Sequence, residues 1–468
     1  MSEVRFSGGR LAPAHAVIER ALETSNASGS IVIVYDRTEA EVRFANNTTT
    51  TNGNRSDRRI VVVSTRERTG GTSVGVASAS GAADVADLVR AADAESQGAD
   101  VADDASPLLD GGVDPDLDKP VEAQDLERLD HVVASLAAAF DHARKGDRVL
   151  AGFAEHSTEV VYVGSSTGTR IRHVQPTGRL QLVSRSSDGT RSAWAGVGSA
   201  DLETADLGAI EEQLAQRLGW AEKHIELEPG RYDVVLPADA VADLMTLVLD
   251  AASGRDAEDG RSVFSAPGGK TRIGDVLSSL SFELRSDPAE PGLECSPFLA
   301  VGTSGTDVSV FDNGLHLERT KWIEGGKLER LQYHRAGARK SGAIPTPPID
   351  NLVLELPGAA TTAEEMVRDV ERGLLLTCLW YIRTVDPSTL LLTGLTRDGV
   401  YVIENGRIVG ATNNFRWNES PVDLLRRATV AGRTRRALSR EFNEYLPRTA
   451  MPPLRVPDFN MSSVSKAT

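Results

Sequence analysis

Histidine is the side chain that most often binds zinc or moves protons near neutral pH, so a pair of histidines at ligand spacing would indicate a metal or catalytic site. No two of them form a His-x3-His or His-Glu-x2-His pair. His131 and His142 lie on one predicted helix but too far apart to share a metal ion. His316 and His334 could face each other across a predicted hairpin, although a solvated or core-edge role is the simpler interpretation. The eight histidines are residues 15, 131, 142, 156, 173, 224, 316 and 334.

Two glycine-rich motifs have the composition of catalytic or phosphate-binding loops. Residues 164–168 read Gly-Ser-Ser-Thr-Gly, as in a nucleophile elbow, which needs a strand before the serine and a helix after it. A predicted strand follows instead, so a β-turn is expected. Residues 268–271 read Gly-Gly-Lys-Thr, as at the end of a P-loop, but residue 264 is Phe where that motif needs its first glycine. A surface turn is expected there too.

Two pairs of carboxylates have a spacing that could support acid–base chemistry. Asp239 and Asp243 are four residues apart on one face of a predicted helix, and Asp250 and Asp256 follow soon after. No histidine lies near them in the sequence. We therefore interpret Asp239 and Asp243 as surface acids, and keep an enzyme built on such a pair as the weakest of three functional hypotheses.

The two cysteines cannot form a disulfide framework or a four-cysteine zinc site. Cys378 lies in an apolar strand and is expected to be a buried small hydrophobe, whereas Cys295 is expected to be the more exposed thiol. The N-terminus has no apolar segment of signal-peptide length, and no run of 18 apolar residues occurs. We therefore expect a cytoplasmic protein with reduced thiols and no membrane association.

The length and charge of the chain limit its class further. A chain of 468 residues suits two domains of roughly 200 residues each. Its net charge of −16 argues against nucleic-acid binding. Residues 81–130 hold 15 acidic and three basic residues, which favours a solvated helix and linker over a docking strip for a partner.

A group of six arginines near the C-terminus runs against this acidic balance. We predict that they lie on one long helix over residues 421–445. A nucleic-acid patch is one interpretation, but a solvated face, or a contact to an acidic partner or to the chain's own acidic strip, is favoured. The arginines are residues 426, 427, 433, 435, 436 and 440.

The pattern of apolar residues predicts an α+β fold with two parts. In residues 1–228, helices are expected at 13–25, 84–96, 123–145 and 202–228, around β-rich runs that form an antiparallel sheet. In the helix at 123–145 the expected apolar stripe is Leu126, Leu129, Val133, Leu136 and Phe140.

Residues 229–468 are predicted to form a twisted antiparallel sheet or a partly closed β-barrel with helices. Turn pairs such as Asn313-Gly314 and Asn405-Gly406 separate many β-type segments at hairpin spacing. Residues 298–305 and 307–314 are among the segments expected to be strands. Helices are expected at 238–252, 362–372 and 421–445. In the first of these, Val241, Leu244, Val248 and Leu249 form an apolar stripe.

Residues 232–264, YDVVLPADAVADLMTLVLDAASGRDAEDGRSVF, resemble the segment that opens the catalytic half of the TldD/PmbA (TldD/TldE) family of metallopeptidases. Active members carry His-Glu-x-x-x-His on this helix. Aligning residues 234–236 and 262–264 with the family pattern puts Thr246, Leu247 and Ala251 at the ligand, base and ligand positions. None of these side chains can bind zinc or take a proton from water at neutral pH.

Further stretches at 160–194, 310–342 and 394–428 resemble the family in the same order, so the similarity spans nearly the whole chain. Active members also supply a cysteine ligand near the C-terminus. The matching tail, YLPRTAMPPLRVPDFNMSSVSKAT, has no cysteine. The resemblance therefore indicates a TldE/PmbA-like subunit that lacks catalytic, cofactor-binding and metal-binding residues of its own.

The resemblance further implies a heterodimer with a TldD-like catalytic subunit, which would carry the zinc. The expected substrates are unfolded peptides, bound as an added β-strand. Our main hypothesis is thus a non-catalytic subunit of a peptide-degrading or peptide-processing metallopeptidase. The first alternative is a homodimer that binds peptides without cutting them.

Overall fold

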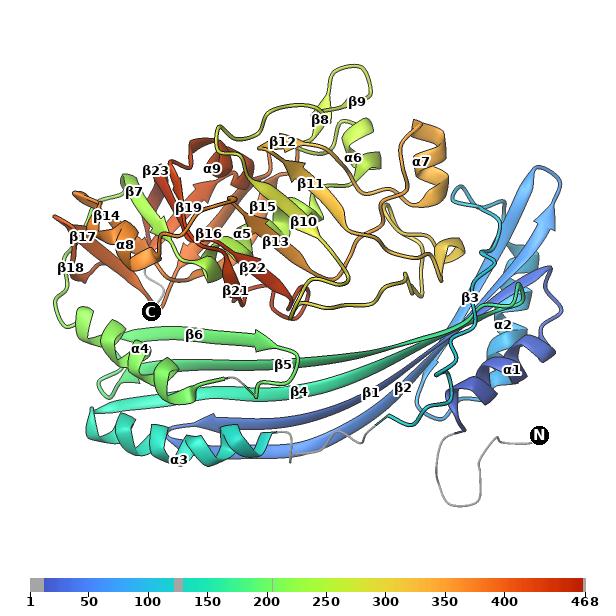
Figure 1. Ribbon diagram of the computed structural model, residues 1–468, viewed down its shortest axis with the longest axis horizontal. Helices are drawn as coiled ribbons and strands as arrows, with labels where there is room; N and C mark the ends of the chain where they lie inside the picture. The colour runs from blue at the N-terminus through green and yellow to red at the C-terminus, as the bar shows by residue number, and fades with distance from the viewer. Residues whose placement is uncertain (1–11, 122–128, 204, 466–468) are drawn as a thin grey trace.

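The computed structural model describes residues 12–121, 129–203 and 205–465. Figure 1 shows two parts stacked on each other, with the N-terminal part as one long, curved sheet and the C-terminal part lying against one face of it. Both parts mix helices with mainly antiparallel sheets, so the predicted α+β fold class is confirmed. None of the helices in the described ranges combines the length and apolarity needed to span a lipid bilayer.

The N-terminal sheet has six strands in the order β3-β2-β1-β4-β5-β6, all paired antiparallel. Its strands are unusually long, and β1 and β2 meet at a tight turn where Asn46 and Asn47 adopt positive φ. The strands are β1 Gly29–Ala45, β2 Thr48–Arg68, β3 Gly71–Ser80, β4 Arg148–Ser165, β5 Arg170–Ser186 and β6 Ser192–Ser199.

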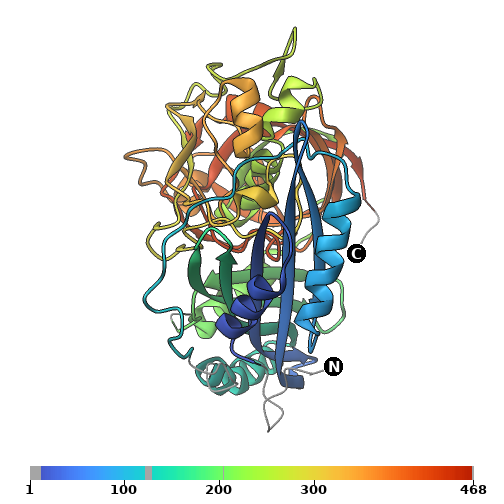
Figure 2. The ribbon, with the colours of Figure 1, turned by 90° about the vertical axis from the view of Figure 1, so that its right-hand side faces the viewer.

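Four helices cover one face of this sheet. Figure 2, seen from the end that carries α1 and α2, shows both helices packed on the long strands. At that end the even-numbered residues Val32 and Val34 face the helices, while Ile31 and Ile33 face the C-terminal part. Because successive side chains of a strand point to opposite faces, the same sheet contributes to one apolar core on each face. The helices are α1 Ala14–Thr24, α2 Val85–Gly98, α3 Asp130–Lys145 and α4 Leu207–Trp220.

The C-terminal part contains a nine-stranded sheet, a six-stranded sheet and a two-stranded hairpin. The larger sheet has the order β15-β16-β19-β23-β7-β14-β17-β18, with β20 beside β23. Its strands are β7 Gly230–Leu236, β14 Arg372–Leu376, β15 Leu379–Asp386, β16 Leu391–Thr396, β17 Val400–Glu404, β18 Arg407–Ala411, β19 Phe415–Glu419, β20 Val430–Ala431 and β23 Leu454–Val464.

The six-stranded sheet has the order β12-β11-β10-β13-β22-β21, and β8 pairs with β9 in the hairpin. These strands are β8 Ser265–Ala266, β9 Lys270–Thr271, β10 Glu283–Ser286, β11 Thr320–Glu324, β12 Lys327–Leu328, β13 Leu352–Glu355, β21 Arg435–Ala437 and β22 Thr449–Met451. The helices of this part are α5 Ala238–Asp250, α6 Gly254–Glu258, α7 Arg335–Ser341, α8 Ala363–Arg368 and α9 Pro421–Arg427.

Helix α5 lies in a common core of the two large sheets. The predicted stripe of Val241, Leu244, Val248 and Leu249 is buried, as expected, but so are most other positions of the helix. A helix that is buried on nearly every side is a core element rather than a surface helix. Residues placed on α5 are therefore held rigidly by packing from both sheets.

Several predicted elements need correction. The long helix expected at 421–445 ends at Arg427 and is followed by the short strands β20 and β21. The helix expected at 362–372 is α8, and Arg372 already begins β14. Residues 298–305 and 307–314 form loops and a short 3-10 turn rather than strands.

The helix expected at 123–145 also differs in its buried face. Its residues 123–128, and with them Leu126, lie outside the described residues. Within α3, Val132 is buried whereas Val133 is 41% exposed, so the predicted stripe is wrong by one position there. Leu129, Leu136 and Phe140 are buried as expected. The shift follows the contact of α3 with α4 and the sheet, which favours Val132.

Candidate functional site

The side chain at the first motif position, Thr246, lies inside the protein core. It is 1% exposed, and its hydroxyl donates a hydrogen bond of 2.9 Å to the carbonyl oxygen of Ala242, one turn back on α5. Its oxygen is thus engaged with the helix backbone and reaches no open space. A ligand for a metal ion in a reactive site would need to face a cavity instead.

The other two motif positions lie at the end of α5. Leu247 is half-buried against the core, and Ala251 follows the last helical residue. The carbonyl groups here are already occupied, because Ser262 donates its hydroxyl to the Ala251 oxygen at 2.7 Å and the Gln332 amide donates to the Leu249 oxygen at 2.7 Å. These bonds satisfy carbonyls that a helix end leaves free.

Ionisable groups do gather just beyond this helix end. The hydroxyl of Tyr445 lies 3.5 Å from a carboxylate oxygen of Asp250. Burial raises the pKa of Asp307 to about 6, and also raises the pKa of Asp250. Across the described residues, no three His, Cys, Asp or Glu side chains are placed so that they could hold a metal ion together.

Asp243, one turn before Thr246, is not the surface acid that we predicted. Its side chain is 1% exposed and accepts hydrogen bonds from the Ser439 hydroxyl, from the Arg440 backbone N–H at 3.3 Å and from the Glu441 N–H at 2.9 Å. Burial raises the pKa of Asp243 to about 7. The carboxyl group therefore anchors the segment 439–441 on α5.

Asp239 holds the start of the same segment. Its carboxylate accepts a bond of 3.0 Å from the Leu438 N–H and pairs with Arg435 at 3.0 Å. The two acids that sequence spacing singled out thus act together in the structure. Both carboxylates hold the C-terminal loop in place through hydrogen bonds.

Arg440 links this loop to the N-terminal sheet. Its guanidinium lies 4.7 Å from the ring centre of Trp380 and 5.6 Å from that of Trp194, which belongs to β6. It also pairs with Asp398 at 2.5 Å and donates to the Cys378 sulfur at 2.7 Å. Cys378 is buried, as predicted, and burial raises its pKa to about 12.

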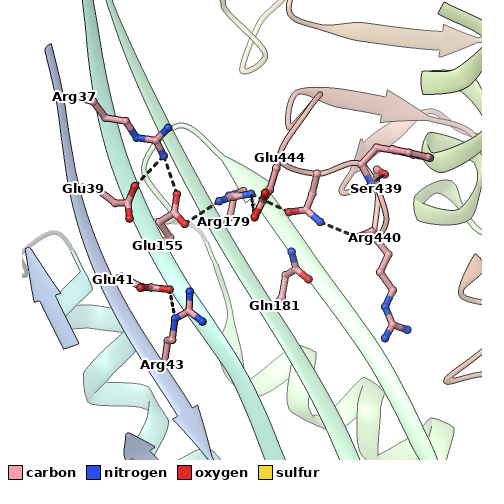
Figure 3. Close-up of polar contacts among 12 residues, drawn as sticks. Arg37, Glu39, Glu41, Arg43, Glu155, Arg179, Gln181, Ser439, Arg440 and Glu444 are labelled. Carbon is pink, nitrogen blue, oxygen red and sulfur yellow. Dashed lines mark hydrogen bonds and ion pairs between the residues drawn. The ribbon is translucent and has the colours of Figure 1, made fainter. Parts of the chain in front are cut away.

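A second link between the two parts is a chain of charges on the sheet face opposite the helices (Figure 3). Arg37 pairs with Glu155 at 3.4 Å, and Glu155 pairs with Arg179 at 2.8 Å. Arg179 then donates a bond of 2.9 Å to the side-chain oxygen of Asn443. The side chains of Glu155 and Arg179 are each only 9% exposed, so these are nearly desolvated contacts.

A cavity of about 550 Å³ lies between the sheet and the C-terminal loop at this point. It combines aromatic faces with charges of both signs and amide groups. Its lining includes Phe153, Gln181, Arg185, Trp194, Trp380, Arg440, Glu441 and Glu444. No sequence pattern predicts this cavity, because its residues come from β4, β5, β6, β15 and the loop after β21, with no motif joining them.

The other residues considered from the sequence have structural positions. Residues 164–168 cover the end of β4 and the turn that leads to β5, and residues 268–271 cover the turn of the β8–β9 hairpin and the short strand β9, so a turn lies in each motif as predicted. Cys295 was expected to be exposed but is 3% exposed, and burial raises its pKa to about 12.

Three of the histidines make structural contacts in separate parts of the fold. His334 accepts a 3.2 Å bond from the Gly337 N–H at the start of α7. His142 pairs with Glu211 of α4, and His131 contacts the Leu202 carbonyl at 2.7 Å.

The fold and the framework around α5 are those of a metallopeptidase-related protein. Residues 229–463 match the model of the PmbA/TldA metallopeptidase C-terminal domain, and residues 115–222 match that of the central domain. The chain belongs to the PmbA/TldD family, as the sequence resemblance predicted.

Solved structures share the whole fold. TldE from Thermococcus kodakarensis has 17% identity and a TM-score of 0.77, with 96% of this chain and 99% of that chain covered. A proposed modulator of DNA gyrase from Thermotoga maritima has 17% identity and a TM-score of 0.72, over 95% and 98% of the two chains. A second such protein, from Bacteroides thetaiotaomicron, has 15% identity and a TM-score of 0.69, over 96% and 98%. No curated protein matched the sequence.

Proposed function

We propose that this chain is the non-catalytic, TldE/PmbA-like subunit of a heterodimeric TldD/TldE zinc metallopeptidase that degrades or processes unfolded peptides. The proposal rests on the side chains at the three motif positions, none of which can bind zinc. Thr246 is buried and bonded to its own helix, and Leu247 and Ala251 offer only carbon atoms. These residues do not fit a zinc ion, so the metal and the general base would belong to the partner.

The packing of α5 supports a scaffolding role. In an active subunit this helix would present polar ligands, whereas here it is filled with apolar contacts to both sheets. Replacing ligands by Thr246 and Ala251 avoids burying polar groups that no metal would satisfy. The helix can then brace the subunit without chemistry of its own.

The cavity between the sheet and the 439–444 loop supports a role in holding peptides. Trp194, Trp380 and Phe153 offer flat apolar surfaces, while Arg185 and Glu444 offer both charges. Such a surface accepts many side chains with little selectivity. We expect it to form part of the wall along which an unfolded peptide approaches the partner's active site.

The test compares the purified chain with its mixture with a family member that carries His-Glu-x-x-x-His. Alone, the chain should contain far less than stoichiometric zinc by elemental analysis and should not cleave an unfolded fluorescent casein. The mixture should elute as a heterodimer in size-exclusion chromatography with light scattering, and should cleave casein faster than the partner alone. Stoichiometric zinc in the isolated chain would refute the proposal. A stable homodimer that binds casein and ignores the partner would instead favour the peptide-binding alternative.

A further inference from the structure

A cavity of about 550 Å³ is lined by residues of α4 in the N-terminal part and of α8 and β18 in the C-terminal part, and by none of the three motif positions. Figure 1 shows where these three elements lie. Its most unusual property is its charge. Five arginines line it, against one acidic residue, Glu364, in a protein with a net charge of −16. The arginines are Arg217, Arg368, Arg407, Arg433 and Arg435.

Arg217 is the most informative of these residues because it is buried. It is 8% exposed, and its guanidinium donates to the carbonyl oxygen of Trp194 at 2.6 Å. It forms no ion pair with a carboxylate among the described residues. Burial accordingly lowers the pKa of Arg217. A buried guanidinium without a counter-ion is costly, so such groups are normally paired.

The surrounding arginines do not relieve this cost. Arg435 pairs with Asp239, but Arg368, Arg407 and Arg433 have no carboxylate within ion-pair distance in the part of the chain that the structure describes. Like charges gathered around one cavity repel each other, and the repulsion is stronger where protein replaces water. An anion in the cavity would remove both penalties.

The remaining lining defines the chemistry of that anion. Gln213 and Gln216 of α4 add amide donors, and Thr361 and Thr362 add hydroxyl groups. Trp220, Val367, Leu375 and Ile408 provide an apolar wall, with Trp220 held edge-on against Tyr401 at 5.2 Å between ring centres. Guanidinium groups bind phosphate and carboxylate through paired N–H donors.

We propose that this pocket binds a small organic anion that carries a phosphate or several carboxylates on an apolar body. The proposal does not depend on the peptidase role, because this pocket has no lining residue in common with the cavity between the sheet and the 439–444 loop. The two are linked through Arg217, which donates to the backbone carbonyl of Trp194. Since α4 and α8 come from different parts of the chain, a bound anion would also tie the two parts together. Binding should therefore raise the melting temperature.

The test uses isothermal titration calorimetry of the full chain at constant ionic strength, with phenyl phosphate, inorganic phosphate and citrate as probes. Phenyl phosphate should bind with a Kd below about 1 mM, and inorganic phosphate about tenfold more weakly because it lacks the apolar group. Tighter binding of citrate with the same arginine dependence would support the site and assign a polycarboxylate. Thermal unfolding with each probe gives an independent readout.

The variant R407Q/R433Q should weaken binding by at least about tenfold, since each arginine supplies a charged donor pair. Both side chains are solvent-accessible and unpaired among the described residues, so the variant should keep the wild-type melting temperature without ligand. The matched control R319Q/R416Q removes two arginines elsewhere and should bind as the wild type does. The absence of binding by all three probes up to about 10 mM, or equal losses in both double variants, would overturn the proposal.

Discussion

The guanidinium of Arg179 on β5 donates a hydrogen bond of 2.9 Å to the side-chain oxygen of Asn443. This contact connects the N-terminal sheet to the loop that Asp243 anchors on α5. Figure 3 shows the part of this path from Arg37 through Glu155 to Arg179. Through the bonds of Asp243, the path continues from the loop to the helix that holds the degenerate motif positions. These nearly desolvated groups add to the apolar contacts that Ile31 and Ile33 make with the C-terminal part.

Substitution of Arg179 by Ala should destabilise the protein by about 2–4 kcal/mol, because it leaves the buried Glu155 with only the 3.4 Å contact to Arg37. Urea unfolding followed by tryptophan fluorescence measures this change. The control is R43A, which removes an arginine that is 62% exposed from the same sheet face and should cost less than about 1 kcal/mol. Equal losses in the two variants would contradict the role assigned to Arg179.

Asp243 should make stability depend on pH. Its folded-state pKa of about 7 lies above the ordinary value of 3.8, so the folded state keeps a proton that the unfolded state releases. Stability should therefore fall as pH rises from about 4 to about 7, by up to ~4 kcal/mol, and this contribution should stay constant above that range.

The variant D243N should flatten this pH dependence, because an amide does not titrate and can still accept bonds from Ser439 and Glu441. The control D141N alters an exposed acid that pairs with Arg144 and should keep the wild-type profile. Unfolding free energies between pH 4 and pH 8 provide the measurement. A D243N profile that is as steep as the wild type would show that another group is responsible.

Restoring the His-Glu-x-x-x-His residues alone should not create a peptidase. The variant T246H/L247E/A251H should bind no stoichiometric zinc, since Thr246 faces the core and no third ligand is supplied. It should also lose about 2–4 kcal/mol of stability because a larger polar side chain enters a filled core. The conservative T246V variant should cost no more than about 1 kcal/mol. Tight zinc binding by the triple variant would show that the helix still faces an open metal site.

Gly152 should tolerate no side chain. A Cβ atom at this position of β4 would lie 2.0 Å from the carbonyl oxygen of Gln181 on β5, and both residues line the cavity between the sheet and the C-terminal loop. G152A should therefore cost more than about 2 kcal/mol in the free energy of unfolding. G53A in β2, where nothing lies within 4 Å, should change stability by less than about 0.5 kcal/mol. A similar tolerance of both substitutions would indicate that β4 and β5 can separate at this point.

The sequence alone determined the elements whose signals are local. The apolar stripe of α5 follows from its own periodicity, and the Asn405-Gly406 turn between β17 and β18 follows from its residue types. The family, and with it the positions Thr246, Leu247 and Ala251, could also be read from residue order. Each of these features depends on neighbours along the chain.

Only the tertiary structure decided the features that depend on distant residues. The arginines after Arg427 do not share a helix: Arg433 lines an open cavity, Arg435 pairs with Asp239 and Arg440 pairs with Asp398. Asp243 was expected on the solvent-facing side of a helix and Cys295 in an exposed loop, yet both are buried, Asp243 against residues 439–441 far along the chain. Burial is set by which elements pack together, and local residue patterns carry little information about that packing.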